Sequence, residues 1–129
     1  PIYNPPWGKI TAIDMNTGEH LWWVATGDTP DRIRNHPALQ GVQLPESTGN
    51  GAAPSMTTKA LLLYYSQGSG GEPRLYALDK RTGARVGEID LPGSGEYGMM
   101  SYMHQGRQYI MTQVSGRGLP GSLAAFRLP

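Results

Sequence analysis

Acidic side chains and histidines are the residues of this sequence whose types and spacing could do chemistry. Asp28 and Asp31 form a carboxylate pair of the kind used in general acid–base catalysis. They flank Thr29-Pro30, however, so helix capping and an interaction with the helix dipole are the simpler interpretation. His36 lies in a long loop and His104 at a predicted hairpin tip. We interpret both histidines as solvent-exposed, and a substrate contact is the alternative for His36.

Metal, thiol and phosphate sites are not indicated by the sequence. The chain has no Cys, and its 3 His and its acidic residues lack the spacing of a metal-ligand set. The absence of Cys also excludes disulfides and a thiol nucleophile. The glycine-rich run 68–71 is not a phosphate loop, because no Lys-Ser/Thr follows it and no helix opens after it. We therefore assign no catalytic residue and no metal ligand.

Composition favours an all-β fold. Among 129 residues there are 18 Gly and 11 Pro, and only 16% are charged, which fits short strands and turns better than helices. The net charge of +1 without a basic block argues against nucleic acid as a partner. The apolar run Ala60–Tyr65 is far too short for a membrane helix. The chain begins at Pro1 without a signal peptide, so we expect a processed or cut piece.

A strand–turn–strand pattern positions the remaining features, and it recurs along the chain. Alternating residues of Gly8–Asp14 lead into the turn Asn16-Thr17-Gly18, and a return strand follows that carries Trp22 as a packing surface. The stretch Leu75–Gly83 repeats this pattern, and Leu123–Arg127 is a truncated third copy. We interpret Asp14 and Asp79 as turn residues. Repeated β units of this size predict propeller blades.

The repeats divide the chain into four parts. Residues 1–24 form a half blade, 25–53 a long connection with a short helix, 54–91 a full blade, and 92–129 an incomplete last blade. The helix is expected to start at Thr29-Pro30-Asp31, with Thr29 as its capping hydroxyl, and to end at Pro37. We expect residues 115–121 to form a loop. The strands after the connection are predicted at Met56–Thr58, Leu61–Tyr65, Arg74–Asp79, Val86–Leu91, Met99–Met103, Gln108–Val114 and Leu123–Leu128.

Two sets of residues resemble a known family. Ala12-x-Asp14-x-x-Thr17-Gly18-x-x-x-Trp22 resembles the tryptophan-docking motif of quinoproteins, the dehydrogenases that use pyrroloquinoline quinone (PQQ). The second copy has Gly87 where the docking tryptophan belongs, so we expect a weaker contact between blades there. The end of the chain is similar to the C-terminus of the membrane-bound glucose dehydrogenases and their quinate and shikimate relatives, in Met100-Ser101-Tyr102, Gly106–Ile110 and Leu123–Pro129.

The resemblance implies part of an eight-bladed periplasmic propeller that oxidises a sugar or alcohol and passes electrons to quinone. The parent enzyme would be anchored to the inner membrane by an N-terminal region outside this chain. It would use PQQ and a calcium ion that polarises the cofactor, with an Asp as general base. No carboxylate of this sequence matches the calcium ligands or the base, so the chain alone is expected to be inactive.

Four residues are candidates for cofactor binding under this resemblance. Arg117 and Gly116 lie in the last glycine-rich loop, and the Arg117 guanidinium could pair with the carboxylates of PQQ. Asn50 and Gly51 precede a strand whose start should face the central channel. A solvated Arg117 on a flexible loop is the alternative. The sequence departs from the family at Gly98-Met99, where Thr-Pro is common, and at Gly116-Arg117-Gly118, where Gly-Gly-His is frequent.

Two other functions stay open at this point. The chain could belong to a non-enzymatic propeller scaffold for protein contacts, or it could be a small β protein that oligomerises through open strand edges. An arc of blades leaves such edges unpaired, so the expected partners are the remaining blades or copies of the chain.

Overall fold

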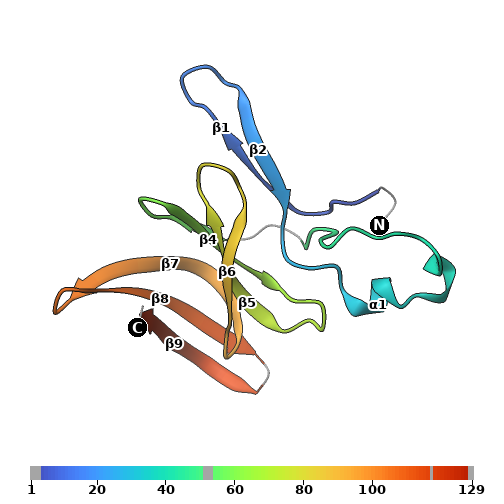
Figure 1. Ribbon diagram of the computed structural model, residues 1–129. Helices are drawn as coiled ribbons and strands as arrows, with labels where there is room; N and C mark the ends of the chain where they lie inside the picture. The colour runs from blue at the N-terminus through green and yellow to red at the C-terminus, as the bar shows by residue number, and fades with distance from the viewer. Residues whose placement is uncertain (1–3, 51–53, 117, 128–129) are drawn as a thin grey trace.

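The computed structural model describes residues 4–50, 54–116 and 118–127, and Figure 1 shows their arrangement. Within these residues the strands form three antiparallel sheets in which spatial order follows chain order. The predicted all-β, antiparallel fold is confirmed. The elements are β1 Lys9–Ile13, β2 His20–Ala25, α1 Asp31–Arg34, η1 Pro37–Leu39, β3 Ser55–Thr57, β4 Leu61–Gln67, β5 Pro73–Asp79, β6 Arg85–Asp90, β7 Ser94–His104, β8 Arg107–Gly116 and β9 Leu119–Arg127.

The three sheets differ in size. The first sheet pairs β1 with β2, the second has the order β3-β4-β5-β6, and the third has the order β7-β8-β9. The strands of the third sheet are longer than the sequence predicts. Pairing between β8 and β9 continues to Gly116 opposite Leu119, so the expected loop 115–121 is for the most part paired strand. A backbone φ of +89° at Gly116 suits the reversal at this end.

The turns of the first and second sheets share one hydrogen-bond pattern. Asp14 Oδ1 accepts from the N–H of Asn16 at 2.8 Å, and Asp79 Oδ1 accepts from the N–H of Arg81 at 2.8 Å. At Asp79, the hydrogen bonds from backbone amides, of which that of Arg81 contributes most, lower the pKa of the carboxyl. The interpretation of both aspartates as turn residues is confirmed.

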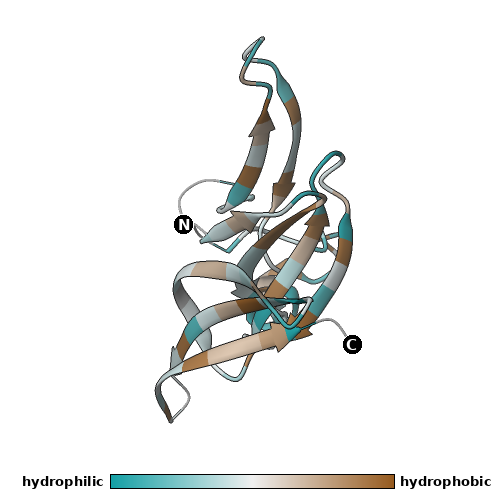
Figure 2. Cartoon of the chain, turned by 90° about the vertical axis from the view of Figure 1, so that its left-hand side faces the viewer, coloured by the Kyte–Doolittle hydropathy of each residue, from teal (hydrophilic) through white to brown (hydrophobic). Residues whose placement is uncertain are grey.

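The central strands of the second sheet, β4 and β5, are largely buried on both faces. Side chains alternate along its strands, so that neighbouring residues point to opposite sides. The run Leu61-Leu62-Leu63 therefore makes β4 apolar on both faces; Figure 2 colours the chain by hydropathy. The buried side chains on the face toward the first sheet are Leu62, Tyr64, Tyr76 and Leu78, against which Ile10, Trp22 and Val24 pack. Those on the other face are Leu63, Tyr65 and Leu75, with Leu91, and they contact Met99, Ile110 and Phe126 of the third sheet.

The indole of Trp22 joins the first sheet to the second. Its N–H donates to the carbonyl of Lys80 at 3.2 Å. A Cβ built on Gly83 would lie 2.7 Å from the indole ring, so only glycine allows this approach, and its φ of +75° suits the turn. The neighbouring Trp23 is 57% exposed, with the Lys9 ammonium 6.0 Å from its ring centroid. It points to the opposite face because neighbouring strand residues alternate.

The connection 26–50 contains the two helical segments. α1 begins at Asp31, the last residue of the predicted start Thr29-Pro30-Asp31. Thr29 does not cap it: Pro30 is at the N-cap position without a side-chain bond, and the Thr29 hydroxyl donates to the carbonyl of Pro45 at 2.6 Å. Pro37 begins η1 after α1 has ended at Arg34. The helices of the described chain are too short to cross a membrane.

Candidate functional site

A small polar hollow contains one of the predicted cofactor-binding residues. Asn50 lies in its wall, and the hollow has a volume of about 170 Å³. The other lining residues are contributed by the second sheet and the start of the third: Pro54, Tyr65, Ser66, Gln67, Pro73, Ser94 and Gly95. The Ser66 hydroxyl is buried beside Gly27 and does not face a ligand in the hollow. The hollow therefore offers the side-chain amides of Asn50 and Gln67 to a polar ligand.

Asn50 is held in place from two sides. Its backbone N–H donates to the Thr26 hydroxyl at 3.1 Å, and its side-chain amide donates to Gln67 Oε1 at 3.1 Å. The residue before it, Gly49, has a φ of +78°, and a Cβ there would lie 2.4 Å from the backbone of Gly8. The end of the connection thus lies directly on the start of the first sheet. The side-chain carbonyl of Asn50 receives no hydrogen bond from a described residue, so it remains available as an acceptor.

Gly116 lies at the same end of the sheets as Asn50. It follows Ser115, which pairs with Ser94 of β7, and Ser94 lines the hollow. A Cβ on Gly93 would lie 2.7 Å from the Ser115 carbonyl oxygen, which shows how closely the backbones approach here. The structure therefore brings Asn50 and Gly116 toward one region. The other two candidates, Gly51 and Arg117, lie outside the described residues.

Asp28 is the centre of a charged cluster rather than a helix cap. Its carboxylate accepts from Arg85 Nη1 at 2.9 Å and from the Tyr76 hydroxyl at 3.2 Å, and Arg74 Nη1 lies 3.7 Å away. Burial, followed by the charge of Asp28, raises the pKa of the Tyr76 phenol. The phenol therefore stays protonated and donates. This cluster fastens the connection 26–50 onto β5 and β6.

The capping interpretation of Asp28 is thus wrong, and the acid–base alternative gains no support from the geometry. The sequence carries no local signal for the cluster, because Arg85 is 57 positions from Asp28 and Tyr76 is 48. Asp31, by contrast, lies in the first turn of α1 as expected.

Neither His36 nor His104 lines the hollow. The exposed His36 accepts a hydrogen bond from the N–H of Ala38 through Nδ1, at 3.2 Å, and so caps η1. His104 is exposed and lies edge-on to the Tyr109 ring, 6.3 Å between centroids. Among the described residues, no three His, Asp or Glu side chains are close enough to hold a metal ion.

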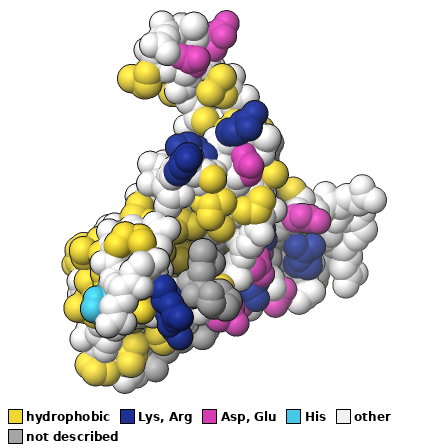
Figure 3. Space-filling model, turned by 60° about the vertical axis from the view of Figure 1, so that its left-hand side comes forward, with side chains coloured by type: hydrophobic (Ala, Val, Ile, Leu, Met, Phe, Trp, Pro, Cys, Tyr) yellow, Lys and Arg dark blue, Asp and Glu magenta, His cyan; other side chains and the backbone are white. Residues whose placement is uncertain are grey.

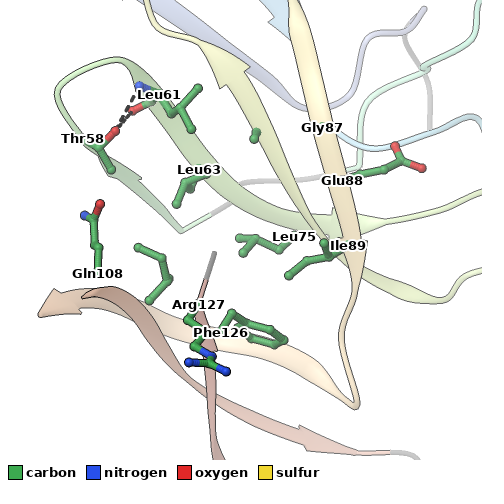
Figure 4. Close-up of a pocket in the computed structure, with 12 residues that line it drawn as sticks. Thr58, Leu61, Leu63, Leu75, Gly87, Glu88, Ile89, Gln108, Phe126 and Arg127 are labelled. Atoms are coloured by element: carbon green, nitrogen blue, oxygen red, sulfur yellow. Dashed lines mark hydrogen bonds between the residues drawn. The ribbon is translucent and has the colours of Figure 1, made fainter. Parts of the chain in front are cut away.

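A second, larger cavity was not predicted. It lies between the second and third sheets and has a volume of about 340 Å³; Figure 4 shows the side chains around it. Gly87, at the position where the first repeat has Trp22, was the sequence signal for it. The lining residues are Thr58, Leu61, Leu63, Leu75, Ala77, Gly87, Glu88, Ile89, Gln108, Ile110, Phe126 and Arg127.

Comparison with known proteins gives consistent matches over most of the chain. The PQQ family described as glucose/ethanol/alcohol dehydrogenase, beta-propeller domain, matches residues 1–110. Quinoprotein glucose dehydrogenase A of Acinetobacter calcoaceticus is 27% identical over 100% of this chain and 16% of its own length. The glycerol dehydrogenase large subunit of Gluconobacter thailandicus is 30% identical over 87% of this chain and 15% of its own.

A third relative is the quinate/shikimate dehydrogenase (quinone) of Acinetobacter baylyi, 28% identical over 90% of this chain and 14% of its own length. The chain thus spans only about one sixth of the curated relatives that it matches.

Proposed function

The chain belongs to the glucose/ethanol/alcohol dehydrogenase family of PQQ β-propellers, and from that membership we propose that its parent polypeptide oxidises a sugar or alcohol and passes the electrons to quinone. The match to residues 1–110 carries this proposal. The named relatives support the substrate class, since they are dehydrogenases of glucose, glycerol and quinate or shikimate. The proposal includes a periplasmic location, which fractionation of the source cells would test.

The polar hollow suits one edge of PQQ but not the whole cofactor. Its volume of about 170 Å³ is below the ~300–1,000 Å³ of typical small-molecule sites, so this chain supplies part of a wall. Asn50 and the backbone near Gly116 would hold a polar edge of the cofactor, and Arg117 is the proposed partner for a carboxylate. When bound, PQQ accepts the electron pair of the substrate. Calcium would depend on carboxylates outside this chain.

The faces at both ends of the arc suit further blades. On the first sheet, the side that points away from the second sheet carries Leu21 and Trp23, which are 59% and 57% exposed. On the third sheet, the corresponding side carries Leu123, 71% exposed, and the stacked pair Tyr102–Tyr109. Figure 3 shows hydrophobic side chains gathered over this part of the molecule, at lower left. Apolar patches of this kind mark protein contacts, and a partial propeller implies other blades.

Activity of the full-length polypeptide tests the function. The purified protein is incubated with PQQ and calcium, and reduction of an artificial dye is followed with glucose, glycerol, quinate and simple alcohols. We expect reduction with at least one of them and none without PQQ. Absence of reduction with every substrate, in a protein shown to be folded, would contradict the proposal and favour a non-enzymatic scaffold.

Substitution of Asn50 tests the hollow. Asn50→Ala in the full-length protein is expected to weaken PQQ binding about tenfold or more, the loss of one or two good polar contacts. Asn35→Ala, at an exposed position of the same connection, is the control and should leave binding unchanged. Equal affinity in both variants would remove Asn50 from the proposed site.

A further inference from the structure

The cavity between the second and third sheets has walls that are almost entirely apolar. Leu61, Leu63 and Leu75 lie on one side, and Ile110 and Phe126 on the other. In Figure 4 the labelled leucines and Phe126 surround the same space. The volume of about 340 Å³ is within the ~300–1,000 Å³ range of small-molecule sites.

The polar residues at its margin are already engaged or turned away. The Gln108 amide donates to the Ser101 hydroxyl at 2.7 Å, and the Thr58 hydroxyl donates to the Leu61 carbonyl at 3.3 Å. The Glu88 carboxylate points away from the cavity in Figure 4 and pairs with Arg74 at 2.5 Å. Arg127 follows Phe126 in β9, so alternation directs its side chain to the opposite face of the strand. A ligand inside the cavity would therefore meet few groups that favour a charge or a strong hydrogen bond.

The two repeats show what shape of group fits such a gap. Ala12 pairs with Trp22 in the first sheet, and Ala77 pairs with Gly87 in the second, so Trp22 and Gly87 occupy the same register position. The indole of Trp22 lies between the first and second sheets, against Gly83. At Gly87, by contrast, no heavy atom of a described residue lies within 4 Å of the place of a Cβ. The cavity lies where an indole from this position would reach.

We propose that this cavity binds a small, uncharged, planar aromatic molecule of one or two rings. The ring would lie between the second and third sheets, as the indole of Trp22 lies between the first and second. A flat ring suits this space because it offers a large apolar surface in a thin layer and can pack on the Phe126 ring. The site is separate from the polar hollow of Asn50 and does not depend on the proposed dehydrogenase activity.

Equilibrium dialysis with indole tests the proposal on the full-length protein. Wild type is expected to bind indole saturably, and Gly87→Trp, whose own ring would fill the cavity, should lose this binding at least tenfold. Val86→Trp is the matched control. It adds the same ring one residue earlier, where the side chain is 57% exposed and alternation points it to the opposite face. Binding to Val86→Trp should equal that of wild type.

Several results would overturn the proposal. Absence of saturable binding to wild type would show that the cavity takes no such ring, and equal loss in both variants would point to another site. If circular dichroism shows that Gly87→Trp is unfolded, Gly87→Leu carries the same test, and retained binding in that folded variant would contradict the proposal.

Discussion

The second sheet meets its two neighbours in different ways. Toward the first sheet, the Trp22 indole lies against Gly83 and donates a hydrogen bond to the backbone of Lys80. Toward the third sheet, the equivalent register position is Gly87, and a cavity of about 340 Å³ lies there. The third repeat copy has Arg127 at the position where the first two copies have Asp14 and Asp79. A repeated strand pattern thus does not guarantee a repeated contact.

The largest loss of stability is expected when the contact of Trp22 with the second sheet is removed. Trp22→Ala should lower the free energy of unfolding by about 2–3 kcal/mol, somewhat below the ~3–5 kcal/mol of a fully buried aromatic, because Trp22 is only partly buried. In the 129-residue chain, where the face of Trp23 is exposed, Trp23→Ala should cost less than about 1 kcal/mol. Urea unfolding followed by circular dichroism measures both. Equal losses would show that Trp22 does not join the sheets.

Substitution of two buried tyrosines, Tyr76 and Tyr65, compares the two faces of the second sheet directly. Tyr76→Phe removes a hydroxyl that donates to Asp28 and to the Gln67 carbonyl, and should cost about 1–3 kcal/mol. Tyr65→Phe removes one bond, with the Thr112 hydroxyl, and should cost about 1 kcal/mol. Both are measured in urea. A larger loss for Tyr65→Phe would reverse the order of the two faces.

A small gain in stability is expected at Gly87, on the side of the second sheet that meets the third. Gly87→Ala should raise the free energy of unfolding by about 0.5–1 kcal/mol, because glycine inside a strand is entropically unfavourable and no described atom obstructs the new methyl group. Gly83→Ala is the counterpart and should be destabilising, since its methyl group would meet the Trp22 ring. Thermal unfolding of the two variants compares them. Destabilisation by Gly87→Ala would mean that the space is filled.

The smallest expected change in stability concerns Asp79, in the turn of the second sheet. Because folding lowers the pKa of Asp79, its ionised form stabilises the folded state above the ordinary carboxyl pKa, and this contribution is lost as the pH falls through the lowered value. Asp79→Asn should therefore unfold with a weaker dependence on pH below about 4. Urea midpoints measured between pH 2 and 7 provide the test. An unchanged pH dependence would show that the turn bonds do not favour the carboxylate.

The sequence predicted the parts of the fold that depend on local pattern. Alternation and the Asp-x-x-Thr-Gly turns located the hairpins of Asp14 and Asp79, since both signals lie within a few neighbouring residues. The capping assignment of Thr29 failed because its hydroxyl bonds instead to Pro45, a partner that the connection brings near only when folded. The extent of β8 and β9 was underestimated because glycine and proline usually interrupt strands.

The site was only partly predictable. Asn50 was identified because it precedes a strand at the inner end of a blade, and the structure places it in a polar hollow. The cluster around Asp28 and the apolar cavity join segments far apart in sequence, so no local spacing reveals them. Gly87 did signal a different contact, but not the size of the space beside it.

Binding of PQQ tests the central claim most directly. In the presence of calcium, the full-length protein is titrated with PQQ and the cofactor absorbance is followed, with the 129-residue chain as a parallel sample. We expect one equivalent to bind to the full-length protein and none to the chain alone, because the chain supplies only part of the wall. A folded full-length protein that binds no PQQ would contradict the account.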